Sequence, residues 1–168
     1  MKNILFATVG ILGIALTGCS SGSSGVQDIE GSWRRASIGT PGQAESAMTA
    51  CPNSITVNGT TVTCGTGDLL AFRTDLTATI DLIDAPTGNP VRLTGSYNRD
   101  GSLVTVRPTQ VATDRNHDGT FDASETVFTD PTARLDLNIE EVSDSKLLVK
   151  LTLDGVEYTA LYNKQFAL

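Results

Sequence analysis

Apolar and polar residues alternate along most of the chain beyond residue 28. Residues 76–82 and 91–97 carry an apolar side chain at every second position, and the same period returns in 135–140 and 147–153. Because successive side chains of a β-strand point to opposite faces, this period predicts strands with one buried and one solvated face. The apolar period of a long amphipathic helix is not found between residues 29 and 168. The hydrophobic pattern therefore predicts an all-β domain.

Turn signals separate these strand candidates. Asn58-Gly59, Asp100-Gly101 and Asp154-Gly155 each stand between two strand candidates, and such pairs tolerate the positive φ angles of two-residue hairpin turns. Further strands are predicted to open at Gly31 and to cover residues 69–73. We predict an antiparallel up-and-down meander of about eight to ten strands that closes into a barrel, because closure removes the unpaired edges of the sheet.

Gly31-Ser32-Trp33 opens the first strand, 93–97 and 103–106 form a hairpin, and 156–162 closes the meander. In this order the strands resemble those of bacterial lipocalin-like (calycin) lipoprotein domains. The resemblance covers most of residues 29–168 and implies a barrel that binds a small apolar ligand or an envelope partner. It also implies that Trp33 plugs the closed end of the barrel beside an arginine of a late strand, where this sequence offers Lys146, Lys150 and Lys164. Trp33 is equally well explained as a core aromatic near the start of a strand.

Residues 1–18 are predicted to form the helix of a lipoprotein signal peptide. An uncharged run from residue 4 to residue 16 is too short to span a bilayer as a permanent helix. It ends in Leu16-Thr17-Gly18-Cys19, which resembles the lipobox of bacterial lipoproteins, and this implies that Cys19 becomes an N-terminus carrying diacylglycerol and palmitate chains. Ser20 follows where an aspartate would favour the inner membrane, which implies the outer membrane of a bacterial envelope. The alternative is an ordinary signal peptide with an unrelated cysteine.

The segment after Cys19 is rich in serine and glycine and is predicted to be a flexible tether. We therefore divide the chain into a signal peptide (1–18), an acylated cysteine with its linker (19–28) and a lipocalin-like barrel domain (29–168). Two or three acyl chains would hold the protein firmly to the membrane, because each buried CH2 contributes about 0.8 kcal/mol.

Cys51 and Cys64 remain as an even pair in an exported, oxidising setting, and a disulfide between them is predicted. The Asn58-Gly59 turn places Cys51 two residues out of register with Cys64, so Pro52 has to bend the chain inward there. The bridge would contribute on the order of 3 kcal/mol in the chain-entropy model. Two catalytic or metal-binding thiols are the alternative, without a histidine or a Cys-x-x-Cys partner to support it.

Residues 114–125 match the twelve-residue EF-hand calcium loop at its diagnostic positions. Alternate residues of a tightly coiled chain can supply the roughly six to eight oxygens that Ca²⁺ requires. Gly119 allows the sharp turn, and Phe121 stands where an apolar residue faces inward. The predicted ligands, all through side chains except for the backbone carbonyl of Thr120, are Asp114, Asn116, Asp118, Thr120, Asp122 (directly or through water) and Glu125 (with both carboxylate oxygens).

The flanks of this loop differ from the helix-loop-helix arrangement of EF-hands. Residues 104–111 are rich in β-branched residues and contain Pro108, so the chain should enter the loop as a strand, and 123–128 can form at most a turn or two of helix. Without two helices to move apart, the loop is predicted to brace the structure rather than to act as a sensor. The alternative is an acidic, solvated turn that binds no ion.

Charge and composition limit the possible functions further. The chain carries 12 Lys and Arg against 19 Asp and Glu, a net charge of −7, which argues against nucleic acid as a partner. The single histidine, His117, falls at a non-ligand position of the calcium loop, and no phosphate-binding glycine loop is found. We predict a membrane-anchored, non-catalytic binding module for a small apolar ligand or an envelope partner. The alternative is a structural or adhesive surface lipoprotein with a filled barrel.

Overall fold

The computed structural model describes residues 28–51, 53–63, 68–84, 87–153 and 155–166. Eight antiparallel strands form a closed barrel, as the alternating pattern predicted. Around the barrel each strand pairs with the next, and β8 pairs with β10 to close the circle. In order around the barrel these are β10 (Leu135–Val142), β11 (Lys146–Leu153), β12 (Val156–Gln165), β1 (Gly31–Gly39), β5 (Leu69–Phe72), β6 (Thr77–Ile83), β7 (Pro90–Asp100) and β8 (Leu103–Thr113).

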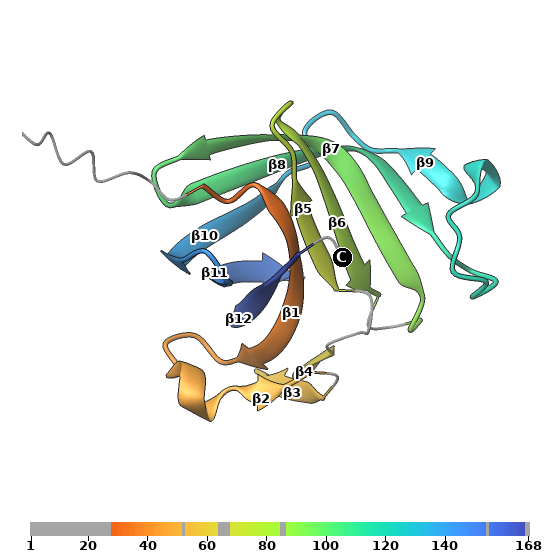
Figure 1. The fold of residues 1–168 in the computed structure, drawn as a ribbon. Helices are drawn as coiled ribbons and strands as arrows, with labels where there is room; N and C mark the ends of the chain where they lie inside the picture. The colour runs from red at the N-terminus through yellow and green to blue at the C-terminus, as the bar shows by residue number, and fades with distance from the viewer. Residues whose placement is uncertain (1–27, 52, 64–67, 85–86, 154, 167–168) are drawn as a thin grey trace, which may run out of the picture.

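Strand β8 pairs with two different neighbours on its far side. Its first half pairs with β10, with Val106 opposite Leu135, and its second half pairs with the short strand β9 (Thr126–Phe128). The chain leaves the barrel at the end of β8 and returns to β9 through a loop and a single 3-10 turn, η2 (Ala123–Glu125). Figure 1 shows this excursion as the cyan segment that projects beyond β7 and β8.

A second excursion from the barrel lies between β1 and β5. After β1 the chain forms the 3-10 turn η1 (Glu45–Ala47), β2 (Thr49–Ala50), and the hairpin of β3 (Ser54–Val57) and β4 (Thr60–Thr63). The turn pairs Val57 with Thr60, as predicted, and Asn58 and Gly59 have φ angles of 51° and 81°. The hairpin is a separate two-stranded sheet rather than part of the meander. It lies across the end of the barrel where β1 finishes (Figure 1).

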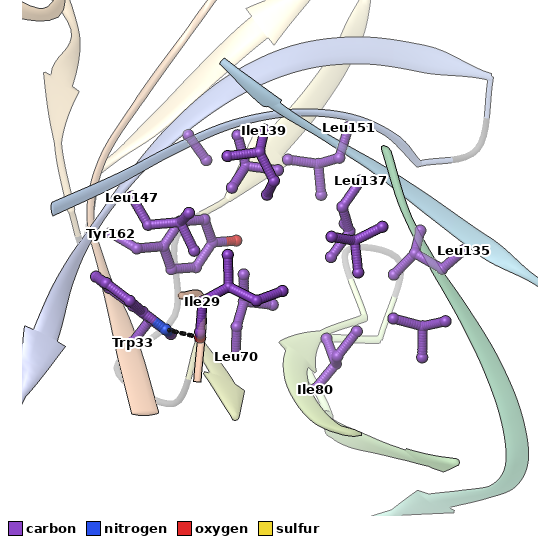
Figure 2. Packing of buried hydrophobic residues seen from close by; sticks show 14 of the residues in the cluster. Ile29, Trp33, Leu70, Ile80, Leu135, Leu137, Ile139, Leu147, Leu151 and Tyr162 are labelled. Carbon is purple, nitrogen blue, oxygen red and sulfur yellow. Dashed lines mark hydrogen bonds between the residues drawn. The ribbon is translucent and has the colours of Figure 1, made fainter. Parts of the chain in front are cut away.

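The inward side chains of the barrel form one apolar cluster (Figure 2). Ile80, Val104, Leu137, Leu147 and Val149 have no exposed surface. A side chain that borders a water-sized void exposes surface to that void, so the barrel is filled at these positions. Leu76 is a correction to the predicted pattern, because it lies in the turn before β6 with a φ angle of 62° and is 56% exposed.

Trp33 lies in the core near the start of β1 and is fully buried. Its indole Nε1 donates a hydrogen bond to the carbonyl oxygen of Ile29 at 2.7 Å (Figure 2). On the neighbouring strand, Lys164 pairs with Trp33 and holds its Nζ 5.0 Å from the ring centroid. A lysine of the last strand therefore lies beside Trp33, where the resemblance implied an arginine.

The predicted signal peptide (1–18), Cys19 and most of the predicted linker lie outside the described residues. Within the described part of the chain, no helix has the length and apolar character needed to cross a bilayer.

Candidate functional site

The predicted calcium loop leaves the end of β8 and is anchored there by its first residue. Asp114 follows β8 directly and is 1% exposed, and its backbone N–H donates to the carbonyl oxygen of Pro90 at 2.9 Å. Pro90 opens β7, so the loop begins against the β6–β7 hairpin. The chain enters the loop as a strand, as its β-branched sequence predicted.

Inside the loop, side-chain oxygens accept hydrogen bonds from the backbone of the following residues. Asp114 accepts from the N–H of Asp118 at 3.2 Å and of Gly119 at 3.0 Å. Asp118 in turn accepts from the backbone N–H of Thr120 at 2.8 Å and from its hydroxyl at 2.6 Å. His117 and Gly119 have φ angles of 58° and 83°. These contacts curl the segment around the carboxylate of Asp114.

The last predicted ligand closes the loop from its far end. Glu125 lies in η2, and its Oε1 accepts from the backbone N–H of Arg115 at 3.0 Å, while Oε2 is 3.5 Å from the N–H of Asp122. The first and last carboxylates of the motif therefore both turn toward the loop. The helical part is a single turn, in line with the limit that the sequence set.

The donor types of this loop suit a hard cation, since they are carboxylate, amide and carbonyl oxygens. Hydrogen bonds from the side chain and backbone of Thr120 hold the pKa of Asp118 below its ordinary value, which keeps this carboxylate charged. Among the described residues, no three Asp, Glu, His or Cys side chains are gathered closely enough to hold a metal ion. Ion binding would therefore require Asp118, Asp122 and Glu125 to exchange contacts with the loop backbone for contacts with the ion.

A pocket of about 250 Å³ lies between this loop and the β6–β7 hairpin. Arg92 on β7 binds Asp81 on β6 through two hydrogen bonds, from Nε at 2.7 Å and from Nη2 at 2.8 Å. Its guanidinium carbon also lies 4.4 Å from the ring centroid of Phe121. The lining residues are Asp81, Leu82, Ile83, Pro90, Arg92, Asp114, Gly119 and Phe121. Sequence reasoning missed Asp81 and Arg92, although opposite charges on the polar faces of two consecutive strands are a usable signal.

A buried polar cluster inside the barrel was also missed. Arg35 on β1 forms an ion pair with Asp68, and their side chains are only 2% and 1% exposed. The hydroxyls of Tyr158 and Tyr162, on β12, are buried and have no hydrogen-bond partner among the described residues. Burial raises the pKa of Tyr162 to about 12 and raises that of Tyr158 further, so both phenols are neutral at ordinary pH.

The predicted disulfide falls partly outside the described residues. Cys51 is half-buried, packs against the core cluster and donates its backbone N–H to the carbonyl oxygen of Ala36 at 2.9 Å. Cys64 lies outside the described residues, so the bridge stays a prediction. In the register of β3 and β4, Ser54 lies opposite Thr63, which is the register assumed in predicting the disulfide.

Comparison with family models, with curated proteins and with solved structures finds no match to this chain.

Proposed function

We propose that this chain is a non-catalytic protein of the bacterial envelope, held to the outer membrane by acyl chains on Cys19, whose filled barrel carries a calcium-braced loop for contact with an envelope partner. The lipobox supports the anchor, and the position of the only histidine, within the loop, supports the absence of catalysis. The observation that carries the proposal is the loop itself, whose first and last carboxylates both turn toward its backbone.

Calcium would be held by Asp114, Asn116, Asp118 and Glu125 through side-chain oxygens, by Thr120 through its carbonyl and by Asp122 directly or through water. The loop carries four carboxylates against Arg115, so the ion relieves repulsion within it. The loop lies between β8 and β9 and touches β7, so the ion would tie three strands together. This arrangement supports a brace and not a moving sensor.

The packing of the barrel supports the envelope-contact version of this function over the small apolar ligand. A ligand in the lumen would need space beside side chains such as Leu137 and Val149, which have no exposed surface. The resemblance to lipocalin-like domains rests on the order of the strands. A barrel without a small apolar ligand in its lumen has the same strand order, so the resemblance does not require such a ligand.

Thermal unfolding with and without Ca²⁺ tests the loop. A ligand at 100 times its Kd stabilises a protein by about 2.7 kcal/mol, which corresponds to a rise of about 8 °C in Tm for a domain of this size. Glu125→Gln should remove the rise, because the bidentate carboxylate is lost. Glu141→Gln, an exposed acid on β10 away from the loop, is the matched control and should keep it. An identical melting curve at millimolar Ca²⁺ and in EDTA would overturn calcium binding.

A further inference from the structure

We propose that the pocket between the loop and the β6–β7 hairpin binds one neutral sugar residue, of the size of a hexose. The proposal goes beyond calcium binding, because most of the lining of the pocket lies outside the calcium loop. Five of its eight lining residues belong to β6 and β7, and the loop contributes Asp114, Gly119 and Phe121.

The size of the pocket restricts the ligand to one compact molecule. Its volume is about 250 Å³. It is slightly smaller than the roughly 300 Å³ at which drug-sized sites begin. A single sugar ring fits this space, whereas a lipid chain would extend beyond it.

The walls provide an apolar surface for the CH groups of a ring. Leu82, Ile83, Pro90 and Phe121 line the pocket, and each remains partly exposed. Covering these side chains removes apolar surface from water, which favours a ligand that presents CH groups on one side.

The Arg92–Asp81 pair provides adjacent donors and acceptors. Arg92 uses Nε and Nη2 for Asp81, which leaves the two N–H groups of Nη1 without a partner among the described residues. The carboxylate of Asp81 has further lone pairs, and the two side chains are 40% and 15% exposed. Neighbouring hydroxyls of a sugar each donate and accept, so two of them can bind this pair together. Stacking on Phe121 holds the guanidinium in place before the ligand arrives.

Charge at the site favours a neutral ligand over an ionic one. An anion would meet Asp81, Asp114 and a chain of net charge −7, and an organic cation would meet the exposed guanidinium of Arg92. A sugar hydroxyl exchanges hydrogen bonds with water for hydrogen bonds with the pair and loses no ionic hydration.

The test is an NMR titration of backbone amides of the barrel domain within the full chain. The probes are D-glucose, D-galactose, D-mannose and N-acetylglucosamine, each up to about 50 mM, because a ligand of this size binds in the millimolar range. Glucuronate and glucosamine serve as anionic and cationic counterparts. We expect saturable shifts at Ile83, Arg92 and Gly119 with at least one neutral sugar, and weaker shifts with the charged ones.

Two variants separate this site from unspecific effects. Arg92→Lys keeps the charge but cannot bind Asp81 through two N–H groups, and should weaken sugar binding about tenfold. Phe121→Leu removes the ring and should also weaken binding. Arg107→Lys, an exposed arginine on β8 outside the pocket, should leave it unchanged.

The titration is recorded in EDTA and in Ca²⁺, so that failure of the sugar site is distinguishable from failure of the calcium loop. Absence of saturable shifts with every neutral sugar in both conditions would overturn the proposal. Shifts that Arg92→Lys and Phe121→Leu leave unchanged, or tighter binding of glucuronate or glucosamine, would overturn it as well.

Discussion

A cluster of buried polar side chains interrupts the apolar interior of the barrel. Arg35 and Asp68 offset part of each other's burial by pairing, but each buried ion still costs several kcal/mol of hydration. The hydroxyls of Tyr158 and Tyr162 have no partner among the described residues, and a buried hydroxyl in this state costs about 1–3 kcal/mol. The centre of the barrel therefore contributes less to the free energy of unfolding than its apolar side chains alone would.

Tyr162→Phe is expected to raise the free energy of unfolding by about 1 kcal/mol, because it removes a buried hydroxyl that makes no hydrogen bond and keeps the ring. Urea unfolding at neutral pH measures this change. Tyr97→Phe is the contrasting variant, since the hydroxyl of Tyr97 donates to the carbonyl oxygen of Arg73 at 3.2 Å, and its loss should cost about 1 kcal/mol. A loss of stability in Tyr162→Phe equal to that in Tyr97→Phe would contradict the prediction.

For single residues, the sequence indicates motifs whose residues are close together along the chain. It does not indicate contacts that form only when distant strands pair. The loop residues from Asp114 to Glu125 follow one another at fixed spacing, so their order alone predicts a calcium loop, and calcium binding stays a prediction. Arg35 and Asp68 are 33 positions apart and meet because β1 pairs with β5. Arg92 and Asp81 meet through the β6–β7 register, which the alternating pattern implies but does not state.

Among the elements, β7 and β8 form the longest pairing, and it contains one irregularity. The register shifts between Thr94 and Gly95, where the two backbones come close together. A Cβ at Gly95 would lie 2.1 Å from the carbonyl oxygen of Arg107 and 2.7 Å from the Cα of Pro108. Only a residue without a side chain fits this approach.

Gly95→Ala should therefore lower the free energy of unfolding by about 1–3 kcal/mol, because the backbone of β8 has to move away from the new methyl group. Ser96→Ala, at the exposed neighbouring position, should change it by less than about 0.5 kcal/mol. Denaturant unfolding of both variants checks this. Equal free energies of unfolding for the two variants would contradict the prediction, because β7 and β8 would then accommodate the methyl group without loss of stability.

The elements also show where alternation fails to predict placement. The strands that contain 135–140 and 147–153 were located correctly because each has a clear buried face, whereas the strand that contains 91–97 was located correctly although only Tyr97 of its apolar positions is buried. The hairpin of β3 and β4 has the same pattern, with Val57 and Val62 buried, yet it covers the end of the barrel. Period two identifies a strand with one apolar face, whereas the surface that this face covers depends on the rest of the fold. The pairing of β9 with β8 was missed for a related reason, since three residues give too short a pattern.

On the scale of the whole molecule, closure and packing determine what the barrel can do. The β8–β10 pairing leaves no free edge in the circle of eight strands, and the core cluster continues from Trp33 at one end to Val57 and Val62 of the covering hairpin at the other. Close packing of these side chains favours the outer surface and the loops, rather than the lumen, as the parts that contact other molecules.

Native mass spectrometry tests this conclusion. After incubation with an envelope lipid extract, we expect the domain to keep the mass of the protein alone, because a lipid in the lumen would need a cavity beside side chains such as Ile80, Leu137 and Leu147, which expose no surface. Leu137→Ala provides the positive control, since the deletion creates an apolar space that can accept a small hydrocarbon. A lipid adduct on the unmodified protein that survives gentle activation would show that the barrel opens in solution and would favour the small apolar ligand. The proposed calcium ion would act in the same direction, because an ion that tied β7, β8 and β9 together would disfavour the separation of strands that ligand entry requires.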